Sequence, residues 1–322
     1  MPGDDLAAAI TGLLGRPLAV DEPIAVAVSG GPDSLALLIL AYAAFGDRVR
    51  VVTVDHGLRA DSAAEAAVVA GYAASLGVAH VTLRWAGPKP TGNLQGAARD
   101  ARYTLMAHWC AANGVAWLAT AHHRDDAAET MLLRLARGSG VGGLGGIRPR
   151  RDLGGGIVLI RPLLAMTKSD LARIVDAAGW AAVDDSSNRA DRFDRTHARA
   201  LLAATPWLDP ARLAASAAHL VDAEAALVWA ADAAWRSRAE IDAAVITVDA
   251  IGLPHDLARR LLLRAVITLA PDATPRGDGV ERALGQLAAG AGSTLGGVAV
   301  RPVVLNGGPA WRFAIAPARR KP

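Results

Sequence analysis

Cysteine and lysine are scarce in this chain of 322 residues. The single cysteine, Cys110, excludes an intramolecular disulfide, a cysteine zinc site and an iron–sulfur cluster held by this chain. Only three lysines occur, so arginine supplies the other 31 of the 34 basic residues. The formal net charge is only +3, which is no strong sign of nucleic-acid binding. Contact with a polyanion would therefore require local clusters of arginine.

Targeting and membrane-spanning segments are also lacking. The N-terminus carries Asp4 and Asp5 but no basic region followed by a long apolar core, so no signal peptide is predicted. The longest apolar run, 35–45, is too short for a bilayer span of about 20 residues. We therefore expect a cytoplasmic protein that makes no membrane contact.

Strand-like and helical patterns alternate through the first two thirds of the chain, which predicts a parallel α/β sheet with helices on both faces. The expected strands are 24–28, 49–54, 78–83, 115–119 and 157–160. The expected helices are 34–45, 62–76, 95–113, 124–137 and 167–179. In such folds, ligands bind beyond the carboxyl ends of the strands.

A domain boundary is expected near Pro206 and Pro210, because the length suggests about two domains of roughly 100–200 residues each. We predict an N-terminal domain over 1–208 and a smaller, mainly helical domain over 209–322. The second should begin with a long helix that ends near residue 238 and stay helical to about 289. A small β element is expected at 294–305 and 311–316.

The first predicted strand runs into the sequence SGGPDS, which predicts a phosphate-binding loop. Two glycines let the backbone approach an anion, and the N–H groups of the following helix point at it with a favourable dipole. No G-x-x-x-x-G-K-[ST] sequence occurs, so the loop is not of the Walker A type. An ordinary strand-to-helix turn with a Ser or Asp cap is the alternative. The loop comprises Ser29, Gly30, Gly31, Pro32, Asp33 and Ser34.

The second predicted strand ends in VDHGLR. Asp55 can bind a ribose hydroxyl or help to hold Mg²⁺, and His56 can hydrogen-bond a base or a phosphate. Arg59 can pair with phosphate through two hydrogen bonds. A solvated turn at the end of the strand would explain the segment equally well, without any ligand.

The segment AHHRDDAAET, 121–130, follows the fourth predicted strand and is denser in ionisable groups. His122, Asp126 and Glu129 share one face if a helix begins here. Two histidines and three carboxylates indicate metal ligation or proton transfer, and Mg²⁺ with substrate phosphates suits them better than zinc. Alternatively, the acidic residues only complement the dipole of a helix N-terminus.

Glycine and arginine patterns elsewhere carry less information. The segment 138–143 matches G-x-G-x-x-G, but it follows a helical pattern where a dinucleotide fingerprint needs a strand, so we reject that assignment. A loop near the active site and a plain glycine-rich linker both remain open. Arg99 and Arg102 are three residues apart on a predicted helix and could reach one phosphate together; an ordinary exposed helix face is the alternative.

These motifs together resemble the tRNA(Ile)-lysidine synthase family. The motifs in the family's order are SGGPDS, VDHGLR, NLQGAARDARY, AHHRDDAAET, LARGSGVGGLGGI, RPLL and DDSSN, which span about residues 24–200. SGGPDS is shared by the wider ATP pyrophosphatase superfamily, whereas the HHRDD and RGSGVGGLGGI segments are more specific. The resemblance implies a Rossmann-like ATP pyrophosphatase domain followed by a domain that contacts tRNA.

The resemblance also implies a reaction. A ligase of this family joins free L-lysine to C2 of the wobble cytidine in the CAU anticodon of an isoleucine tRNA, through an adenylated cytidine, with ATP and Mg²⁺. Asp33 and Asp126 would hold Mg²⁺, with Asp125 as the alternative to Asp126, and the loop 29–34 with Asp55 and His56 would bind ATP. The candidates for binding and deprotonating lysine are His122, Asp125 and Asp126. The substrate-binding arginines implied are Arg59, Arg99, Arg102, Arg137, Arg195 and Arg199. A homodimer is compatible with the resemblance.

The chain departs from the family pattern at three positions. Ala127 stands where the family has glutamine, and Thr196 and His197 occupy altered positions in the basic stretch after DSSN, leaving Arg195 and Arg199.

The main competing interpretation is another enzyme that transfers AMP. A tRNA thiolase would need more cysteine than Cys110, and an amidotransferase would need an additional domain with a nucleophilic cysteine. A synthetase for NAD or GMP is harder to exclude from SGGPDS alone. A tRNA-binding protein with a vestigial ATP loop is the non-enzymatic alternative, against which the intact Asp33, Ser34 and Asp126 argue.

Overall fold

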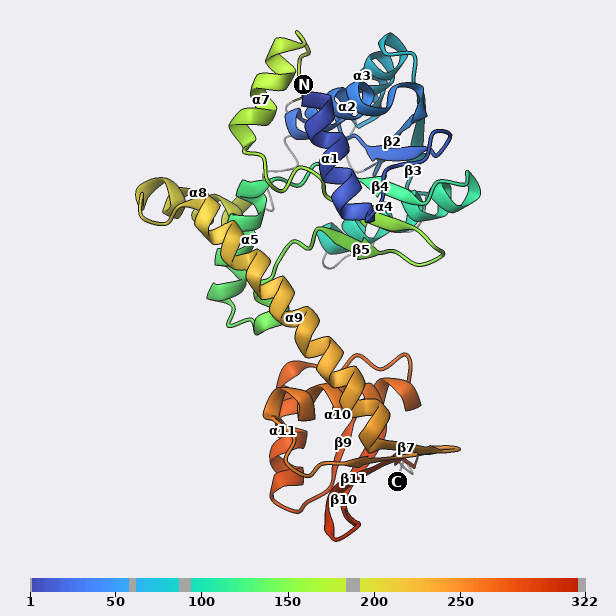
Figure 1. Ribbon diagram of the computed structural model, residues 1–322, viewed down its shortest axis with the longest axis vertical. Helices are drawn as coiled ribbons and strands as arrows, with labels where there is room; N and C mark the ends of the chain where they lie inside the picture. The colour runs from blue at the N-terminus through green and yellow to red at the C-terminus, as the bar shows by residue number, and fades with distance from the viewer. Residues whose placement is uncertain (1, 58–61, 87–93, 184–191, 318–322) are drawn as a thin grey trace. The chain divides into compact units, whose positions relative to one another are not determined.

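The structure is a computed structural model that describes residues 2–57, 62–86, 94–183 and 192–317 (Figure 1). Its contacts divide the chain into two compact units, Met1–Val221 and Asp222–Pro322. The division falls inside the long helix α9 (Pro210–Arg238), whose bounds match the helix expected from the sequence. The expected boundary at 208 lies just before this helix.

The N-terminal unit is built on a six-stranded sheet of order β3-β2-β1-β4-β6-β5. All neighbouring strands are parallel except β5, which runs antiparallel to β6. The strands are β1 (Ile24–Ala27), β2 (Val49–Asp55), β3 (Ala79–Arg84), β4 (Trp117–Ala119), β5 (Arg150–Asp152) and β6 (Val158–Ile160). The predicted parallel α/β sheet is therefore confirmed.

Helices cover both faces of this sheet, and successive residues of the central strand β1 explain why. Ile24 and Val26 pack into a core with residues of α1, α2, α3 and α7, whereas Ala25 packs into a second core with residues of α4. Both faces of such a strand are buried, so both sets of alternating side chains must be apolar. This explains why the sequence of β1 is a continuous apolar run. The helices are α1 (Pro2–Leu14), α2 (Pro32–Phe45), α3 (Ser62–Ser75), α4 (Leu94–Ala112) and α7 (Lys168–Ala177).

The strand order reverses between β1 and β4. From β1 the chain builds outward through β2 and β3, and it then returns to add β4 and β6 on the other side. Loops that leave the two central strands at such a switch point diverge to opposite faces and open a crevice at their carboxyl ends. The loop 29–31 before α2 and the loop 120–123 before α5 (Arg124–Ala136) both begin there.

Five elements were not expected from the sequence. They are α1, β5, a 3-10 turn (Gly46–Arg48), the four-residue helix α6 (Val141–Leu144) and α8 (Arg192–Ala204). The glycine-rich segment 138–143 follows α5, a helix, which confirms the rejection of a dinucleotide fingerprint there. Cys110 is fully buried in the core on the α4 side, and burial raises the pKa of its thiol to about 11, so it is not a reactive cysteine.

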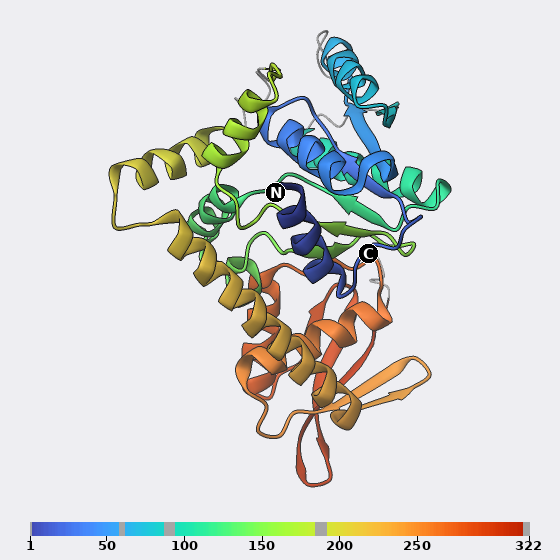
Figure 2. The ribbon, with the colours of Figure 1, turned by 45° about the horizontal axis from the view of Figure 1, so that its top comes forward.

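The C-terminal unit holds a five-stranded antiparallel sheet of order β7-β8-β11-β10-β9, with α10 (His255–Leu269) and α11 (Gly277–Ala288) packed on it (Figure 2). The strands are β7 (Ala239–Asp242), β8 (Val245–Asp249), β9 (Ser293–Leu295), β10 (Val298–Leu305) and β11 (Gly308–Ile315). The expected β element near the end of the chain is confirmed.

The expectation of helix up to residue 289 is wrong at the β7–β8 hairpin. Ile246 and Val248 are fully buried on one face of β8, so the alternating pattern there belongs to a strand. Ala243 occupies the turn with φ of 49°, a conformation usually marked in sequence by glycine or asparagine. Because Ala243 is neither glycine nor asparagine, no signal for a turn is present in the sequence here.

By length and composition alone α9 would pass as a membrane span. Its C-terminal half instead carries Glu224 and Asp232, whose carboxylates pair with Arg260 and Arg264 of α10 at 2.7 and 2.5 Å. Charged pairs of this kind are costly in hydrocarbon, so they favour packing of this half of α9 against its own unit.

Candidate active site

The loop of SGGPDS forms the N-terminus of α2. Gly30 has φ of +90°, and Gly31 caps the helix with its backbone while no side chain caps it, which leaves the helix-end N–H groups for an anion. The Ser34 hydroxyl donates to the Gly31 carbonyl at 2.9 Å and accepts from the Ser29 N–H at 3.1 Å. Ser29 and Ser34 therefore brace the loop itself, with their hydroxyl oxygens 3.3 Å apart.

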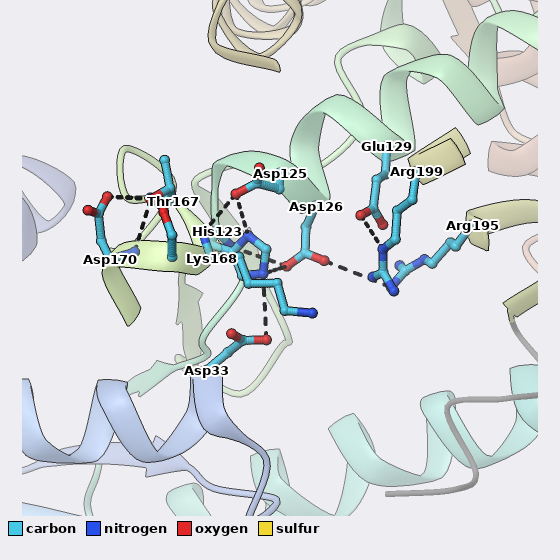
Figure 3. A network of polar contacts seen from close by, with 11 residues as sticks. Asp33, His123, Asp125, Asp126, Glu129, Thr167, Lys168, Asp170, Arg195 and Arg199 are labelled. Carbon is cyan, nitrogen blue, oxygen red and sulfur yellow. Dashed lines mark hydrogen bonds and ion pairs between the residues drawn. The ribbon is translucent and has the colours of Figure 1, made fainter. Parts of the chain in front are cut away.

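The centre of the site is His123, which lies between three aspartates (Figure 3). Its Nε2 lies 3.5 Å from Asp33 Oδ2 of α2 and 3.5 Å from Asp126 Oδ2 of α5. Its Nδ1 lies 3.4 Å from Asp125 Oδ2. This contact joins the loops after β1 and β4 at the switch point of the sheet.

The charge of His123 follows from these neighbours. Burial of the ring, which is 2% exposed, favours the neutral form. The hydrogen bond to Asp33 and the charges of Asp126 and Asp125 outweigh burial, so the pKa of His123 is raised above its usual value. In its protonated form, His123 offsets part of the negative charge of the three aspartates.

Local capping geometry holds the aspartates in place. His123 is the N-cap of α5, and its backbone N–H donates to Asp126 Oδ2 at 3.1 Å in a capping box. Asp125 Oδ2 accepts from the backbone N–H of Lys168 at 2.8 Å, at the start of α7. Thr167 caps that helix and lowers the pKa of Asp170 to about 2. The helix starts α5 and α7 thus lie against one another.

Two arginines of α8 face the acidic side of α5. Arg199 Nε donates to Glu129 Oε1 at 2.5 Å, and Arg195 lies 4.0 Å from Asp126 Oδ1. Arg195 and Arg199 are four residues apart on α8, and their partners Asp126 and Glu129 are three apart on α5. Both spacings correspond to about one helical turn, so the two ion pairs lie on neighbouring turns. Glu129 is 3% exposed, and its Oε2 has no hydrogen-bond partner among the described residues. Thr196 and His197, which depart from the family pattern, are exposed on α8.

His122 is separate from the aspartate cluster. Its Nδ1 lies 3.0 Å from the Thr120 hydroxyl and 3.3 Å from Arg161 Nε. Burial lowers the pKa of His122 well below its usual value, and the charges of four arginines lower it further. These arginines are Arg161, Arg99, Arg195 and Arg102. Of the two adjacent histidines, the structure joins His123 to the carboxylates and His122 to the arginines.

The second motif, VDHGLR, holds its own turn. Asp55 Oδ1 accepts from the Gly57 N–H at 2.8 Å and from the Ser62 hydroxyl at 2.6 Å. The Ser62 hydrogen bond is the main cause of the lowered pKa of Asp55. Both contacts stabilise a turn at the end of β2, which was the second interpretation of the VDHGLR motif. His56 Nε2 lies 3.4 Å from the Arg102 guanidinium, and Arg59 lies outside the described residues.

The remaining predicted arginines fall in two places. Arg99 and Arg102 are exposed on α4, with Arg99 stacked on the Tyr103 ring at 5.5 Å. Arg137 is the C-cap of α5, about 16 Å along the helix from Asp126 by the helical rise per residue. The charges of Arg99, Arg102 and Arg195 act on His122, whereas Arg137 lies at the far end of its helix.

The carboxylates fit a magnesium ion that also binds phosphate. Asp33 Oδ1 is buried and has no hydrogen-bond partner among the described residues. In the described part of the chain, no group of three or more His, Cys, Asp and Glu side chains forms a metal site. Mg²⁺ commonly uses one or two carboxylates and completes its shell with phosphate oxygens and water. Asp33 and Asp126 supply such a partial set.

His123, Lys168 and Arg161 were missed by sequence reasoning. His122 and His123 are equivalent as residue types, and only the helix start at Arg124 makes His123 the N-cap. The S/T/D/N preference at N-caps gave no signal for histidine. Lys168 and Arg161 lie far along the chain from the motifs they join.

Comparisons with known proteins agree with this geometry. A family model described as a PP-loop domain matches residues 5–205. The tRNA(Ile)-lysidine synthase of Zymomonas mobilis subsp. mobilis is 42% identical over 97% of this chain and 94% of that relative. The enzyme of the same name from Novosphingobium aromaticivorans is 42% identical over 92% of this chain and 90% of the relative.

Among solved structures, the chain is similar to the U34-tRNA thiolase NcsA from Methanococcus maripaludis with its 4Fe–4S cluster. The TM-score is 0.56 at 15% identity, over 68% of this chain and 79% of the other. At that identity the likeness concerns the fold alone.

Proposed function

The chain belongs to the tRNA(Ile)-lysidine synthase family of PP-loop proteins, and from this premise we propose how its site performs the reaction. The reaction is the ATP-dependent formation of lysidine in an isoleucine tRNA, so the chain is a ligase. The observation that carries the assignment of the site is the convergence of Asp33, Asp125 and Asp126 on His123 at the sheet's switch point.

The SGGPDS loop binds the phosphates of ATP in this proposal. The uncapped N-terminus of α2 offers backbone N–H groups, and Gly30 and Gly31 allow close approach. Asp33 and Asp126 would hold Mg²⁺, and the bound ion would offset the negative charge of the pyrophosphate leaving group. The buried Oδ1 of Asp33, which has no hydrogen-bond partner in the described part of the chain, supports this role.

The first chemical step is transfer of AMP to the wobble cytidine of the CAU anticodon. The C2 oxygen of the base attacks the α-phosphate of ATP, a P–O bond forms to the base, and the bond to pyrophosphate breaks. Negative charge grows on the phosphate oxygens, so nearby cations are needed. Arg99, Arg102 and Arg195, whose charges act on His122, are the described groups suited to this task.

The second step is attack by lysine on C2, with AMP as the leaving group. The ε-amine has an unperturbed pKa of about 10.4, so it must give up a proton before it attacks. We assign the ammonium site and the proton acceptor to the carboxylates Asp125 and Asp126. Glu129, whose Oε2 has no hydrogen-bond partner among the described residues, is a further acceptor for an ammonium group of lysine.

The C-terminal unit contacts tRNA through its arginines in this proposal. Arg301 of β10 and Arg312 of β11 lie directly opposite one another and are exposed. In the described part of the unit, no carboxylate lies within ion-pair distance of either. Like charges placed opposite one another in a sheet are unfavourable unless an anion lies between them. Arg282 lines a neighbouring polar groove with Arg301, which extends the basic surface.

We place the reaction in the cytoplasm, where ATP, lysine and tRNA occur together. The test is incorporation of radiolabelled lysine into an unmodified CAU-anticodon isoleucine tRNA, with and without ATP. A methionine tRNA with the same anticodon is the matched control. ATP-dependent label in the isoleucine tRNA alone is the expected result. Absence of label, with ATP still cleaved to AMP for another acceptor, would retain the PP-loop chemistry and discard the substrate.

A further inference from the structure

Arg161, the first residue of the RPLL segment after β6, is a buried cation without an anionic partner. The residue is 5% exposed, and no carboxylate of the described chain lies within ion-pair distance of it. Burying an arginine in this way is unfavourable unless every N–H finds an acceptor. The neutral groups that it contacts are therefore informative.

Two hydrogen-bond acceptors contact the guanidinium. One terminal nitrogen donates to the backbone carbonyl of Arg148. The Nε atom donates to His122 Nδ1 at 3.3 Å. The backbone of Arg161 is itself held, because its N–H donates to the Pro149 carbonyl at 2.9 Å. The guanidinium is thus anchored on one side and presents Nε to His122 on the other.

The direction of this hydrogen bond determines the form of the imidazole. A guanidinium has donors only, so Nδ1 of His122 must carry a lone pair. Protonation of Nδ1 would set two N–H groups against each other. The remaining proton of a neutral ring must then lie on Nε2. All hydrogen bonds recorded for His122 are at Nδ1, so among the described residues no protein group partners Nε2.

The charges that face His122 from each packed element act in the same direction. Arg161 comes from the end of β6, Arg99 and Arg102 from α4, and Arg195 from α8. Four positive charges disfavour a positive imidazole and attract a negatively charged oxygen to the same place.

We propose that Arg161 is a positioning residue that holds His122 as the neutral imidazole with its proton on Nε2, so that His122 donates a hydrogen bond to a nucleotide phosphate oxygen and does not take the proton of lysine. The part of this proposal that concerns the substrate rests on the proposed function. The part that concerns the form of His122 does not, and it is tested without any substrate.

The direct test is nitrogen NMR of the protein labelled with ¹⁵N-histidine, with His122→Gln used to assign the His122 signals. In the unaltered chain we expect the Nε2–H tautomer with an unprotonated Nδ1 throughout about pH 5–8, the range in which an ordinary histidine titrates. A His122 that titrates there, or that carries its proton on Nδ1, would overturn the proposal.

Arg161→Met removes the donor and replaces a buried cation with an apolar chain of similar length. We expect the His122 signals of this variant to shift toward a mixture of tautomers. Arg161→Lys retains a donor and should restore part of the original signal. If the tautomer is unchanged in Arg161→Met while the variant keeps the circular dichroism of the folded chain, Arg161 is not the positioning group.

The second test separates a hydrogen-bond donor from a base. Glutamine places an N–H near the position of Nε2 but cannot take up a proton at neutral pH, and phenylalanine offers neither. We expect His122→Phe to lower kcat/KM by about ten- to hundredfold and His122→Gln to recover a clear part of that loss with an unchanged pH profile. Equal losses in the two variants would show that His122 acts as a base.

The KM values of the same variants for ATP and for tRNA show which substrate supplies the phosphate oxygen. A rise in KM for ATP alone assigns the oxygen to ATP, and a rise in KM for tRNA alone assigns it to the RNA backbone. An unchanged kcat and KM for both substrates in His122→Phe would overturn the contact with phosphate, whatever the tautomer.

Discussion

His122 and His123 are adjacent, yet their surroundings favour opposite protonation states. The His123 ring contacts three aspartates, which raise its pKa against the effect of burial. His122 is only half-buried, and both its partial burial and the charges of arginines around it lower its pKa. A backbone that turns into a helix at Arg124 sends the two side chains to different neighbours. At this scale the chemistry depends on environment more than on residue type.

Asp33→Asn tests the residue at the centre of the proposed Mg²⁺ site. The substitution keeps the size of the side chain and removes the charge that a divalent cation requires, so kcat for lysidine formation should fall at least 10²-fold. The affinity for tRNA, measured by filter binding, should stay within about twofold.

Asp47→Asn is the matched control, because Asp47 is exposed in the 3-10 turn at the end of α2. It should leave kcat unchanged. Turnover of Asp33→Asn close to that of this control would exclude Asp33 as a metal ligand.

At the scale of elements, the active site depends on helix N-termini that meet at one edge of a sheet. The starts of α2, α5 and α7 are joined by the contacts of Asp33 with His123 and of Asp125 with Lys168. Each start is determined by its own cap, and the sheet order brings the caps together.

Gly30→Ala tests the loop that precedes α2. The residue has φ of +90°, and a Cβ there would meet Val183 at 3.3 Å, so alanine should lower the free energy of unfolding by about 1–2 kcal/mol and raise KM for ATP. Chemical denaturation and steady-state kinetics measure the two effects.

Gly71→Ala is the control for backbone effects alone. Gly71 lies inside α3 with open space around it, so alanine there should stabilise the chain by about 0.5–1 kcal/mol and leave KM unchanged. A Gly30→Ala variant that behaves like this control would argue against a strained loop.

Glu22, in the loop between α1 and β1, links that loop to β4 and provides a pH prediction. It accepts two hydrogen bonds from Arg16 and one from Trp117 Nε1, and its pKa is lowered to about 2, chiefly by Arg16. A carboxyl with a lowered folded-state pKa stabilises the fold above its unfolded-state pKa of about 4.5, and this contribution is lost as pH falls toward about 2.

Glu22→Gln should therefore cost about 1–2 kcal/mol at pH 7, after allowance for solvent screening of Arg16, and the difference from the parent should shrink below pH 4.5. Denaturant unfolding at pH 7 and at about pH 3 measures it. A difference that is the same at both pH values would mean that the carboxylate charge does not stabilise this loop.

At the scale of the whole molecule, the chain consists of a PP-loop unit and a smaller α+β unit, with α9 contributing to both. The first unit carries the described site residues, whereas the second carries exposed arginines on a sheet face. This arrangement separates the chemistry from the surface that we propose contacts the RNA backbone.

The double variant Arg301→Gln and Arg312→Gln should weaken tRNA binding about ten- to hundredfold and reduce the slope of log Kd against log salt concentration by about one to two. Arg259→Gln is the matched control, because Arg259 is paired with Asp256. The control should keep the salt slope of the parent. An unchanged slope in the double variant would remove this sheet face from the RNA contact.

The sequence by itself determined the parallel α/β fold, the positions of its main strands along the chain, the family and the loop that precedes α2. These features are local: apolar runs, glycines and helix caps act over a few residues, and the motifs retain their spacing. Where a local signal was missing, as at Ala243 in the β7–β8 turn, the prediction failed.

Only the tertiary structure decided which charged side chains meet. Asp33 and His123 are 90 residues apart and lie 3.5 Å from each other, and Arg161 reaches His122 across a separation of 39 residues. Asp55, which the sequence offered as a ligand, is occupied by its own turn. Pairings between distant elements depend on strand order and side-chain direction, which a linear pattern does not contain, and the choice between His122 and His123 therefore had to come from the folded chain.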